Sequence, residues 1–388
     1  MTESGNPRNP ILILGGGPIG MTCALLLARQ GWSCEIFDAR PVQALEGDRR
    51  LLALSRGSWL ALEGLLGARF APAAPIERVH VSSRGEPGAV ELGARDFGAS
   101  AVGATVWFGD LAAALGRACT QHPGIRMQRP RRIERVAQHP GGVRIFLDDA
   151  TQVEGILAID AEGTPPRMRE AKSHALLAEL ELAGVRAGDA FERFTREGPL
   201  ALLPIPQASA PSPGRRMSMI WCLPTVVARE RALLGDADLR LHIAQALGPR
   251  LGSPVSIGPR ALFALHTHRI ERIWEHRLVH LGNAAQTLHP VAGQGFNLGI
   301  RDCICLRDAI VRAARQSGQD PIGARDTYLR ARRMDRHAMP GLTAALPAVF
   351  EPSFVPLAVA RSAALLALDA IPALRRPFTR LLMFGTPR

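Results

Sequence analysis

Residues 11–28 read ILILGGGPIGMTCALLLA, and this stretch decides the fold of the chain. The first four residues form an apolar run that is typical of a buried strand. Residues 15–20 are rich in glycine, and an apolar helical pattern follows them to Ala28. The stretch therefore predicts a strand, a glycine turn and a helix in direct succession.

The spacing of the glycines suits a dinucleotide. Gly15 permits a tight turn, Gly17 lets backbone amides approach a pyrophosphate, and Gly20 lets the helix pack closely on the strand. Pro18 and Ile19 open the helix, whose N-terminus faces the phosphate charge. We therefore expect these five residues to bind a dinucleotide cofactor.

A second predicted strand, residues 34–38, ends in Asp38. An acid about 20 residues after the glycines accepts hydrogen bonds from the adenosine ribose hydroxyls in such sites. The strand, the helix and Asp38 together favour a dinucleotide over a glycine turn without a ligand. NAD and FAD fit these residues equally well.

A second distinctive segment begins at residue 277. Residues 277–282 read RLVHLG and predict a strand that ends in glycine, and residues 283–302 read NAAQTLHPVAGQGFNLGIRD. This segment resembles the ribityl- and flavin-ring-binding motif of the aromatic flavin hydroxylases with a p-hydroxybenzoate-hydroxylase-like fold. Its GNAAQTLHP form is similar to that of the 2-polyprenyl-6-methoxyphenol hydroxylases of ubiquinone biosynthesis.

The resemblance implies that FAD is the cofactor, and it implies roles for particular residues. Asn283 stands where the family usually has aspartate, and its amide can still bond the ribityl chain. Pro290 and a loop would lie against the flavin ring at a helix N-terminus, whose dipole stabilises a reduced anionic flavin. Arg50 matches an FAD-contacting arginine. The loop residues are Gly293, Gln294, Gly295, Phe296 and Asn297.

One family motif is altered in this chain. Residues 159–169 read IDAEGTPPRMR, where the family has Ala-Asp-Gly followed by a serine and an arginine. Glu162 takes the place of the aspartate, and Pro166 takes the place of the serine. Since this motif serves the FAD phosphates and NAD(P)H contact in the family, Glu162 is a further expected cofactor residue, and we expect the altered handling of NAD(P)H to be the main consequence.

The resemblance covers most of the chain and implies an α/β fold. A Rossmann-type FAD-binding domain at 1–75, 100–175 and 265–340 would interleave with a mixed-sheet substrate domain at 76–99 and 176–264. Residues 341–388 would form a C-terminal amphipathic helical region. There Leu365, Leu366, Leu368, Ile371 and Leu374 recur at helical intervals beside arginines. This pattern fits a helix docked on the core, a contact with a membrane surface or a prenyl substrate, or both.

The composition bounds the class of protein. The chain has 388 residues, 47% of them hydrophobic, and a formal net charge of +12. Aromatic residues make up only 5%, and the arginines are dispersed, so nucleic acid is not the expected anionic partner. No leader sequence or membrane-spanning run is evident, which predicts a cytoplasmic protein, with peripheral contact at the inner face of the cytoplasmic membrane as an option.

Metal and disulfide chemistry are not expected. The six cysteines are scattered without CxxC pairs, and we interpret them as reduced, mostly buried thiols. His266 and His268 lie two apart, but no further ligand is close in sequence.

The family resemblance implies the reaction. NAD(P)H reduces FAD, O2 adds to give a flavin hydroperoxide, and a phenol ring attacks it; the preferred substrate is a polyprenylated phenol of ubiquinone biosynthesis. Pro204, Trp221 and His289 are candidates for the substrate pocket, and no catalytic base is named. The alternatives are another ring position, another aromatic substrate, or a non-catalytic flavin-binding subunit of a ubiquinone-biosynthetic complex.

Overall fold

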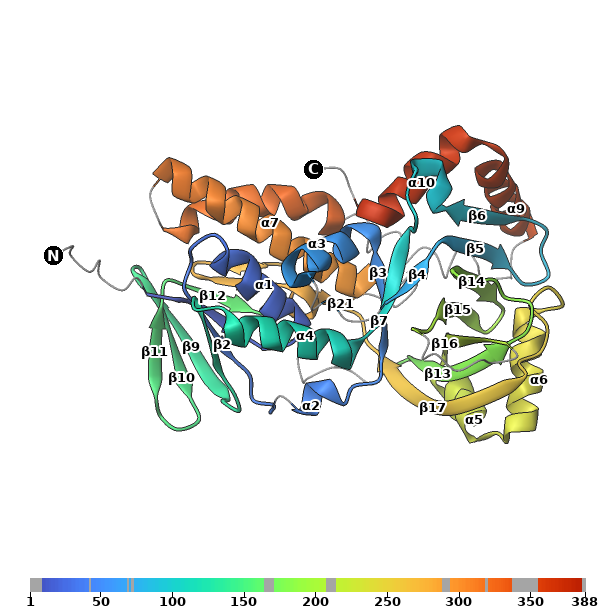
Figure 1. The fold of residues 1–388 in the computed structure, drawn as a ribbon, viewed down its shortest axis with the longest axis horizontal. Coiled ribbons are helices and arrows are strands. Elements are labelled where there is room, and N and C mark those ends of the chain that lie inside the picture. The colour runs from blue at the N-terminus through green and yellow to red at the C-terminus, as the bar shows by residue number, and fades with distance from the viewer. Residues whose placement is uncertain are drawn as a thin grey trace.

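The computed structural model describes residues 9–41, 43–67, 70, 73–163, 171–206, 214–287, 294–317, 320–336 and 355–385. Two large sheets, of six and seven strands, occupy the two ends of the molecule, and the C-terminal helices lie beside the seven-stranded sheet (Figure 1). The predicted fold class is confirmed: a Rossmann-type unit, a mixed second sheet and a C-terminal helical region.

The six-stranded sheet has the order β19-β20-β12-β1-β2-β8, and all neighbours are parallel except β19 and β20. All four residues of β1 are buried because both faces of the sheet are covered. The strands are β1 Ile11–Leu14, β2 Cys34–Phe37, β8 Ile125–Gln128, β12 Leu157–Asp160, β19 Trp274–Glu275 and β20 Leu278–His280.

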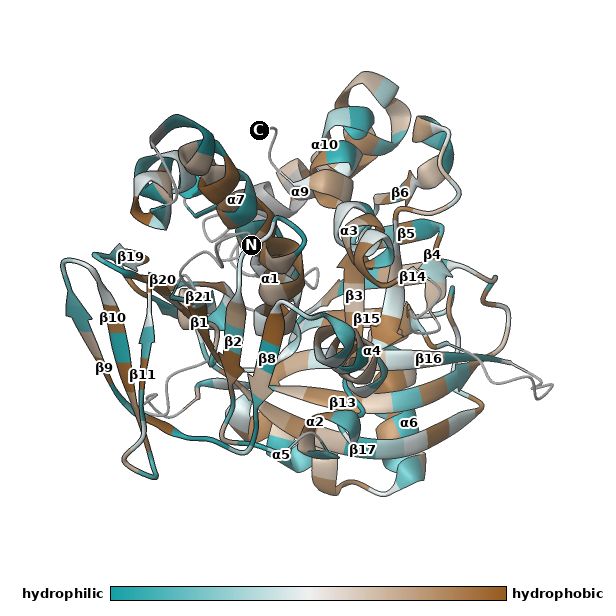
Figure 2. Cartoon of the chain, turned by 60° about the vertical axis from the view of Figure 1, so that its left-hand side comes forward, coloured by the Kyte–Doolittle hydropathy of each residue, from teal (hydrophilic) through white to brown (hydrophobic). Residues whose placement is uncertain are grey.

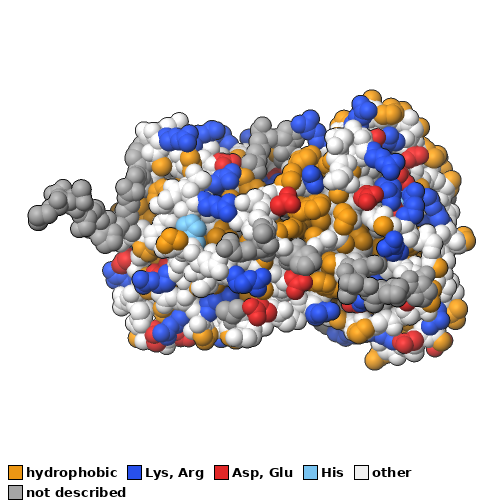
Figure 3. Space-filling view, viewed as in Figure 1, with side chains coloured by type: hydrophobic (Ala, Val, Ile, Leu, Met, Phe, Trp, Pro, Cys, Tyr) orange, Lys and Arg blue, Asp and Glu red, His pale blue; other side chains and the backbone are white. Residues whose placement is uncertain are grey.

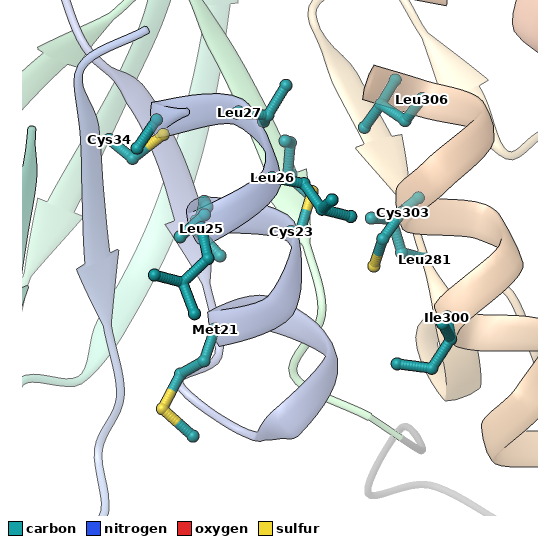
Figure 4. Close-up of a cluster of buried hydrophobic side chains, with 14 of the residues drawn as sticks. Met21, Cys23, Leu25, Leu26, Leu27, Cys34, Leu281, Ile300, Cys303 and Leu306 are labelled. Atoms are coloured by element: carbon teal, nitrogen blue, oxygen red, sulfur yellow. The ribbon is translucent and has the colours of Figure 1, made fainter. Parts of the chain in front are cut away.

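Helices cover one face of this sheet, and a small antiparallel sheet covers the other. Ile11 and Ile13 pack toward α1 (Pro18–Ala28), α4 (Phe108–Gln121) and α7 (Gln294–Ser317). Helix α1 is hydrophobic along most of its length, as Figure 2 shows, and Figure 4 shows its side chains and those of α7 filling the space between the two helices.

Leu12 and Leu14 point the opposite way, toward a three-stranded sheet with the order β11-β10-β9. Its strands are β9 Ile133–His139, β10 Gly142–Leu147 and β11 Gln152–Gly155. Alternate side chains of β1 thus belong to two separate hydrophobic clusters, one on each face of the sheet.

The seven-stranded sheet has the order β17-β13-β16-β15-β14-β5-β6, with only β14 and β5 parallel. Helices α5 (Thr225–Leu233) and α6 (Asp236–Leu247) pack on one face of it. Its strands are β5 Arg78–Ser83, β6 Ala89–Gly93, β13 Ser173–Leu182, β14 Asp189–Thr195, β15 Gly198–Pro204, β16 Arg215–Pro224 and β17 Ser256–Leu265.

Smaller elements connect the two large sheets. A three-stranded sheet has the order β3-β7-β4, and the Thr105 hydroxyl on β7 donates to the carbonyl of Pro204 on β15 at 2.5 Å. The elements are α2 Gln43–Glu46, β3 Leu51–Ser55, α3 Arg56–Leu66, β4 Ala74–Ile76, η2 Ala94–Phe97, β7 Gly103–Trp107, β18 His268–Arg269, η3 Gly282–Ala284, β21 Gln286–Thr287 and η5 Pro321–Ala324.

The domain boundaries expected from the sequence remain a proposal. Every strand of the seven-stranded sheet except the C-terminal end of β17 and the start of β13 lies within residues 76–99 or 176–264. The six-stranded sheet takes its strands from the other proposed segments. This distribution favours the proposed division.

The C-terminal region forms two helices, α9 (Val355–Ala370) and α10 (Pro372–Phe384). The sequence pattern of apolar residues at helical intervals runs through Ile371 without a break. Pro372, however, cannot continue a helix and instead starts a new one. Leu365 is buried with Val90 and Leu92 of β6, whereas Leu366, Ile371 and Leu374 are exposed. No helix in the described part of the chain is long and apolar enough to span a membrane.

All six cysteines are free and buried, as the sequence analysis expected. Among the described residues, no group of three or more histidine, cysteine or acidic side chains is placed to hold a metal ion.

A buried charge network ties α7 to the helical residues 325–336. The Asp302 carboxylate accepts a hydrogen bond from Gly282 N at 2.9 Å and lies 2.5 Å from Arg332 Nε. Arg332, which is fully buried, also contacts Asp335, and Asp335 pairs with Arg301. Burial opposes the Arg332 charge, but Asp302, Tyr328 and Asp335 outweigh it and raise its pKa.

Replacing Arg332 with methionine should destabilise the fold. The substitution leaves Asp302 buried without its cation, which costs roughly 3–5 kcal/mol when one partner of a buried pair is removed. Urea unfolding followed by circular dichroism measures the loss. The control is Arg312→Met on the exposed side of α7; equal unfolding midpoints for the two variants would contradict the role given to Arg332.

Candidate functional site

The glycine turn forms a cradle at the N-terminus of α1. Gly15 has a φ of +101°, and a Cβ there would lie 2.6 Å from the backbone of Ala161. A Cβ on Gly20 would lie 2.0 Å from Gly15 O, so only glycine lets the helix pack this close. Both positions fit the roles that the sequence predicts for them.

Gly17 is different from its neighbours, because a Cβ built on it meets no atom within 4 Å. It is the N-cap of α1, has a φ of −75°, and is followed by Pro18. The space beside Gly17, at the N-terminus of the helix, is therefore open. An anionic group fits there, since unpaired helix N-terminal amides attract negative charge.

Asp38 closes one side of the cradle. Its Oδ2 accepts a hydrogen bond from Gly16 N at 2.9 Å, and its Oδ1 accepts one from Arg40 N at 2.8 Å. Burial acts to raise the Asp38 pKa, but the hydrogen bonds and charge of Arg40 and the charge of Arg129 outweigh it and lower the pKa. Its acceptor positions are filled, so a ribose hydroxyl would displace the exposed side chain of Arg40.

Arg129 is a residue of the cradle that the sequence analysis missed. Its side chain is only 4% exposed, and its Nη2 lies 3.1 Å from Asp38 Oδ2. Its guanidinium carbon would lie 3.2 Å from a Cβ on Gly16. Within the described part of the chain, its buried Nε has no hydrogen-bond partner. A buried donor beside the glycine turn fits an anionic dinucleotide.

Glu162 lies on the other side of the turn. Its Cα would be 2.7 Å from a Cβ on Gly15, its amide donates to Asp160 Oδ1, and its side chain is exposed. The protein atoms that nevertheless surround its carboxyl, and the nearby charges of Asp160 and Asp38, raise its pKa. Pro166 lies outside the described residues.

The second cofactor segment meets the first at Ile19. A Cβ on Gly282 would lie 3.4 Å from Ile19 Cγ2, and one on Gly299 would lie 2.7 Å from Ile19 Cδ1. Asn283, next to Gly282, is exposed and available to a ligand. The two segments, far apart in sequence, are therefore adjacent at the N-terminus of α1.

The loop residues predicted to contact the flavin differ in their surroundings. Gly295 faces open space, and Phe296 packs against the core around α1. Asn297 is only 2% exposed; its amide accepts from Ser55 N at 2.8 Å and donates to Ala53 O at 2.9 Å. Asn297 thus fastens α7 to β3. His289, Pro290 and Gly293 lie outside the described residues, as does the side chain of Gln294.

Arg50 stands at the start of β3. Its guanidinium pairs with Asp48 at 2.6 Å and lies over the Phe108 ring, 4.7 Å from its centre. The side chain is 47% exposed and remains a proposed FAD contact.

The seven-stranded sheet has two unlike faces. Residues facing α5 and α6 are buried, and Trp221 is among them at 1% exposure, so it belongs to the core and not to the site that we propose. Pro204 is half-buried at the edge nearest β7. The opposite face also contains buried residues, such as Ala175 and Cys222; its half-buried and exposed residues away from the Glu179–Arg216 ion pair are called here the open face. It comprises Leu177, Glu192, Ala201, Leu203, Ile220, Ala261 and Phe263.

The open face is turned toward the Rossmann-type unit. Helix α6 lies on the outer side of the sheet in Figure 1, and the other side looks toward β7 and β21. Figure 3 shows hydrophobic side chains gathered in the middle of the molecule, between its two ends. The apolar residues of the open face therefore lie on the side of the sheet that faces the Rossmann-type unit.

The chain is similar to several known proteins. A family model described as "FAD binding domain" matches residues 151–339, which include Glu162 and Asn283. Ubiquinone hydroxylase UbiL of Rhodospirillum rubrum is 29% identical over 98% of this chain and 90% of its own. The 3-demethoxyubiquinol 3-hydroxylase of Escherichia coli is 28% identical, covering 79% of this chain and 81% of its own.

A solved structure shares the fold. The p-nitrophenol 4-monooxygenase PnpA of Pseudomonas putida superposes with a TM-score of 0.75 at 13% identity, over 98% of this chain and 99% of its own.

Two alanine substitutions separate cofactor binding from folding. Gly17→Ala should leave the free energy of unfolding of the apoprotein unchanged but weaken FAD binding at least tenfold, because the added methyl occupies the space kept for phosphate. Gly20→Ala should lower the unfolding free energy, because its Cβ would overlap Gly15 O. Thermal unfolding and FAD titration of both variants measure the two effects.

One result would contradict the assignment of the FAD phosphates to this cradle. If Gly17→Ala bound FAD as the wild type does, the phosphates would not lie at the N-terminus of α1.

Proposed function

Because this chain is an FAD-dependent aromatic monooxygenase that resembles the hydroxylases of ubiquinone biosynthesis, we propose that it hydroxylates the ring of a polyprenylated phenol. NAD(P)H supplies the electrons and O2 the oxygen atom in this proposal. The choice of a prenylated phenol as substrate rests on the chemistry of the open face.

One observation carries the choice of substrate. Six of the seven open-face residues are apolar, and the two on the edge strand, Ala261 and Phe263, are exposed. Residues on the opposite face of the same strands, such as Leu176 and Met219, are fully buried. An apolar, accessible wall across from the cofactor cradle suits a hydrophobic phenol better than a charged aromatic acid.

We assign different parts of FAD to different residues of the chain. FAD, when bound, supplies the activation of O2 and the oxygen transferred to the ring. We assign the pyrophosphate to Gly17 and the N-terminal amides of α1, with Arg129 adding positive charge, and the ribityl chain to Asn283. The open face packs the apolar part of the substrate and excludes water from the reacting ring.

Glu162 should affect how NAD(P)H, the electron donor, binds. It adds a third carboxyl to a region that already holds Asp160 and Asp38, close to where we place the phosphates. Negative charge there disfavours a second phosphate-bearing molecule. We therefore expect slow reduction by NAD(P)H, which Glu162→Gln should accelerate.

The test is spectroscopic. The purified protein should carry bound FAD, and anaerobic NADH or NADPH should bleach it faster when a short-chain prenylated methoxyphenol is present. Bleaching at the same rate with and without the phenol would contradict the choice of substrate. A protein that cannot be loaded with FAD would overturn the function as a whole.

We also propose peripheral contact with an anionic membrane through the C-terminal helices. Val359, Leu366, Leu374 and Phe384 are between 45% and 64% exposed, and Arg376 and Arg380 are exposed on the same helices. Figure 3 shows arginine side chains gathered at this end of the molecule. Apolar area beside cationic charge favours an anionic interface.

Vesicle sedimentation tests this contact. The protein should pellet with phosphatidylglycerol vesicles, and Leu366→Glu together with Leu374→Glu should reduce the bound fraction several-fold without lowering the melting temperature. Equal binding to neutral vesicles, or no effect of the double substitution, would contradict the proposal.

A further inference from the structure

Glu192 is a carboxyl on the open face that the functional assignment above leaves without a role. It lies in the middle of β14, between Phe191 and Arg193. Phe191 packs toward α5 and α6 with the core of the sheet. Since side chains alternate along a strand, Glu192 points the other way, toward the Rossmann-type unit.

The neighbours of Glu192 on this face are apolar. Its register partners are Val81 on β5 and Ala201 on β15, and Ala201 is paired in turn with Ile220 on β16. Among the described residues, its carboxyl makes no hydrogen bond or ion pair, and burial alone raises its pKa to about 7. Its side chain nevertheless keeps partial exposure.

Few other ionisable groups face Glu192. On β16 the nearest is Cys222, whose pKa is raised by burial and by Glu192. On β13, which is three strands away from β14, Glu179 is paired with Arg216. From β5, β6 and the C-terminal helices, the face is covered by Val79, Val81, Val90, Leu92, Leu365, Leu368, Phe378 and Leu382, all apolar.

A structural explanation for this carboxyl is lacking. Buried carboxylates that support a fold are paired or accept hydrogen bonds, and Glu192 does neither within the described part of the chain. An unpaired carboxyl among apolar neighbours lowers stability, and such carboxyls are found where chemistry requires them.

We propose that Glu192 is the base that removes the phenolic proton of the substrate. This inference rests on the proposed function, because it needs a phenol on the open face. The phenol O–H bond breaks and a carboxyl O–H bond forms, while the electron pair stays on the ring oxygen. The ring carbons become more nucleophilic toward the oxygen that FAD and O2 supply. The proton leaves Glu192 for water when product departs.

The match of acidities favours this step. A simple phenol has a pKa of about 10, so it is almost wholly neutral at neutral pH. A carboxyl that ionises near neutrality is a stronger base than an ordinary glutamate and is still ionised in half or more of the molecules.

The experiment is the pH dependence of a single hydroxylation turnover with a short-chain prenylated methoxyphenol. The wild-type rate should rise through about pH 7 and then level off. Glu192→Gln should be about 100-fold slower at neutral pH and should recover only where the free phenol ionises. Glu192→Asp should keep a rise with pH and part of the rate.

A control isolates the effect of position. Glu230→Gln removes an exposed carboxyl from α5, on the opposite face of the same sheet, and should leave the pH profile unchanged. Flavin reduction by NAD(P)H without substrate should be equal in all variants, since Glu192 acts on the phenol.

Thermal unfolding gives a readout independent of turnover. The folded-state pKa of Glu192 is about 7, above its ordinary value of 4.5, so the folded state loses stability as pH rises between these values. Glu192→Gln should therefore raise the melting temperature more at pH above 7 than in mild acid.

The outcomes are distinguishable. A wild-type enzyme that hydroxylates with a rate independent of pH around 7 overturns the role of Glu192, even if the variants fail to fold. A Glu192→Gln profile identical to that of the wild type does the same. A wild-type protein that binds FAD but hydroxylates no phenol overturns the proposed function instead.

Discussion

The Asp302 carboxylate is the contact on which the second half of the site depends. It holds the amide of Gly282 and the buried guanidinium of Arg332 together, so that the turn at 282–284 is fixed against α7. Ile19 at the start of α1 packs against Gly282 and Gly299 from the other side. The cofactor segments can approach one another because the buried ion pair holds the turn in place and because Gly282 and Gly299, which lack side chains, leave room for Ile19.

The two sheets contribute different kinds of surface. The six-stranded sheet is covered on both faces. A cofactor can therefore bind only at the ends of its strands, where β1 is followed by α1. The seven-stranded sheet is covered by α5 and α6 on one face, and α9 and α10 pack over β5 and β6 on the other. Its open face is an apolar wall with a single unpaired carboxyl, Glu192, and this combination suits a neutral phenol that must lose a proton.

The sequence predicted those elements whose structure depends on residues close together in the chain. The glycine spacing, the apolar run of β1 and the periodicity of α1 located the cradle, because each depends on a few neighbouring residues. The family resemblance supplied the cofactor and the class of reaction, which no local pattern determines. The assignments of individual site residues remain predictions.

Other features could not be read from the sequence, because they depend on partners far along the chain. Arg129 and Arg332 look like ordinary arginines until the fold buries them beside Asp38 and Asp302. Asn297 was expected at the flavin, yet its amide fastens β3 to α7. Which face of β16 carries Trp221 depends on where α5 and α6 pack.

The central claim is that this chain transfers an oxygen atom from O2 to the ring of a prenylated phenol. Mass spectrometry of the product formed under heavy-isotope O2, with NAD(P)H and a short-chain prenylated methoxyphenol, tests it most directly. The account predicts one heavy oxygen atom on the ring of each product molecule. A product without the heavy isotope, or NAD(P)H consumption that yields only hydrogen peroxide, would contradict it.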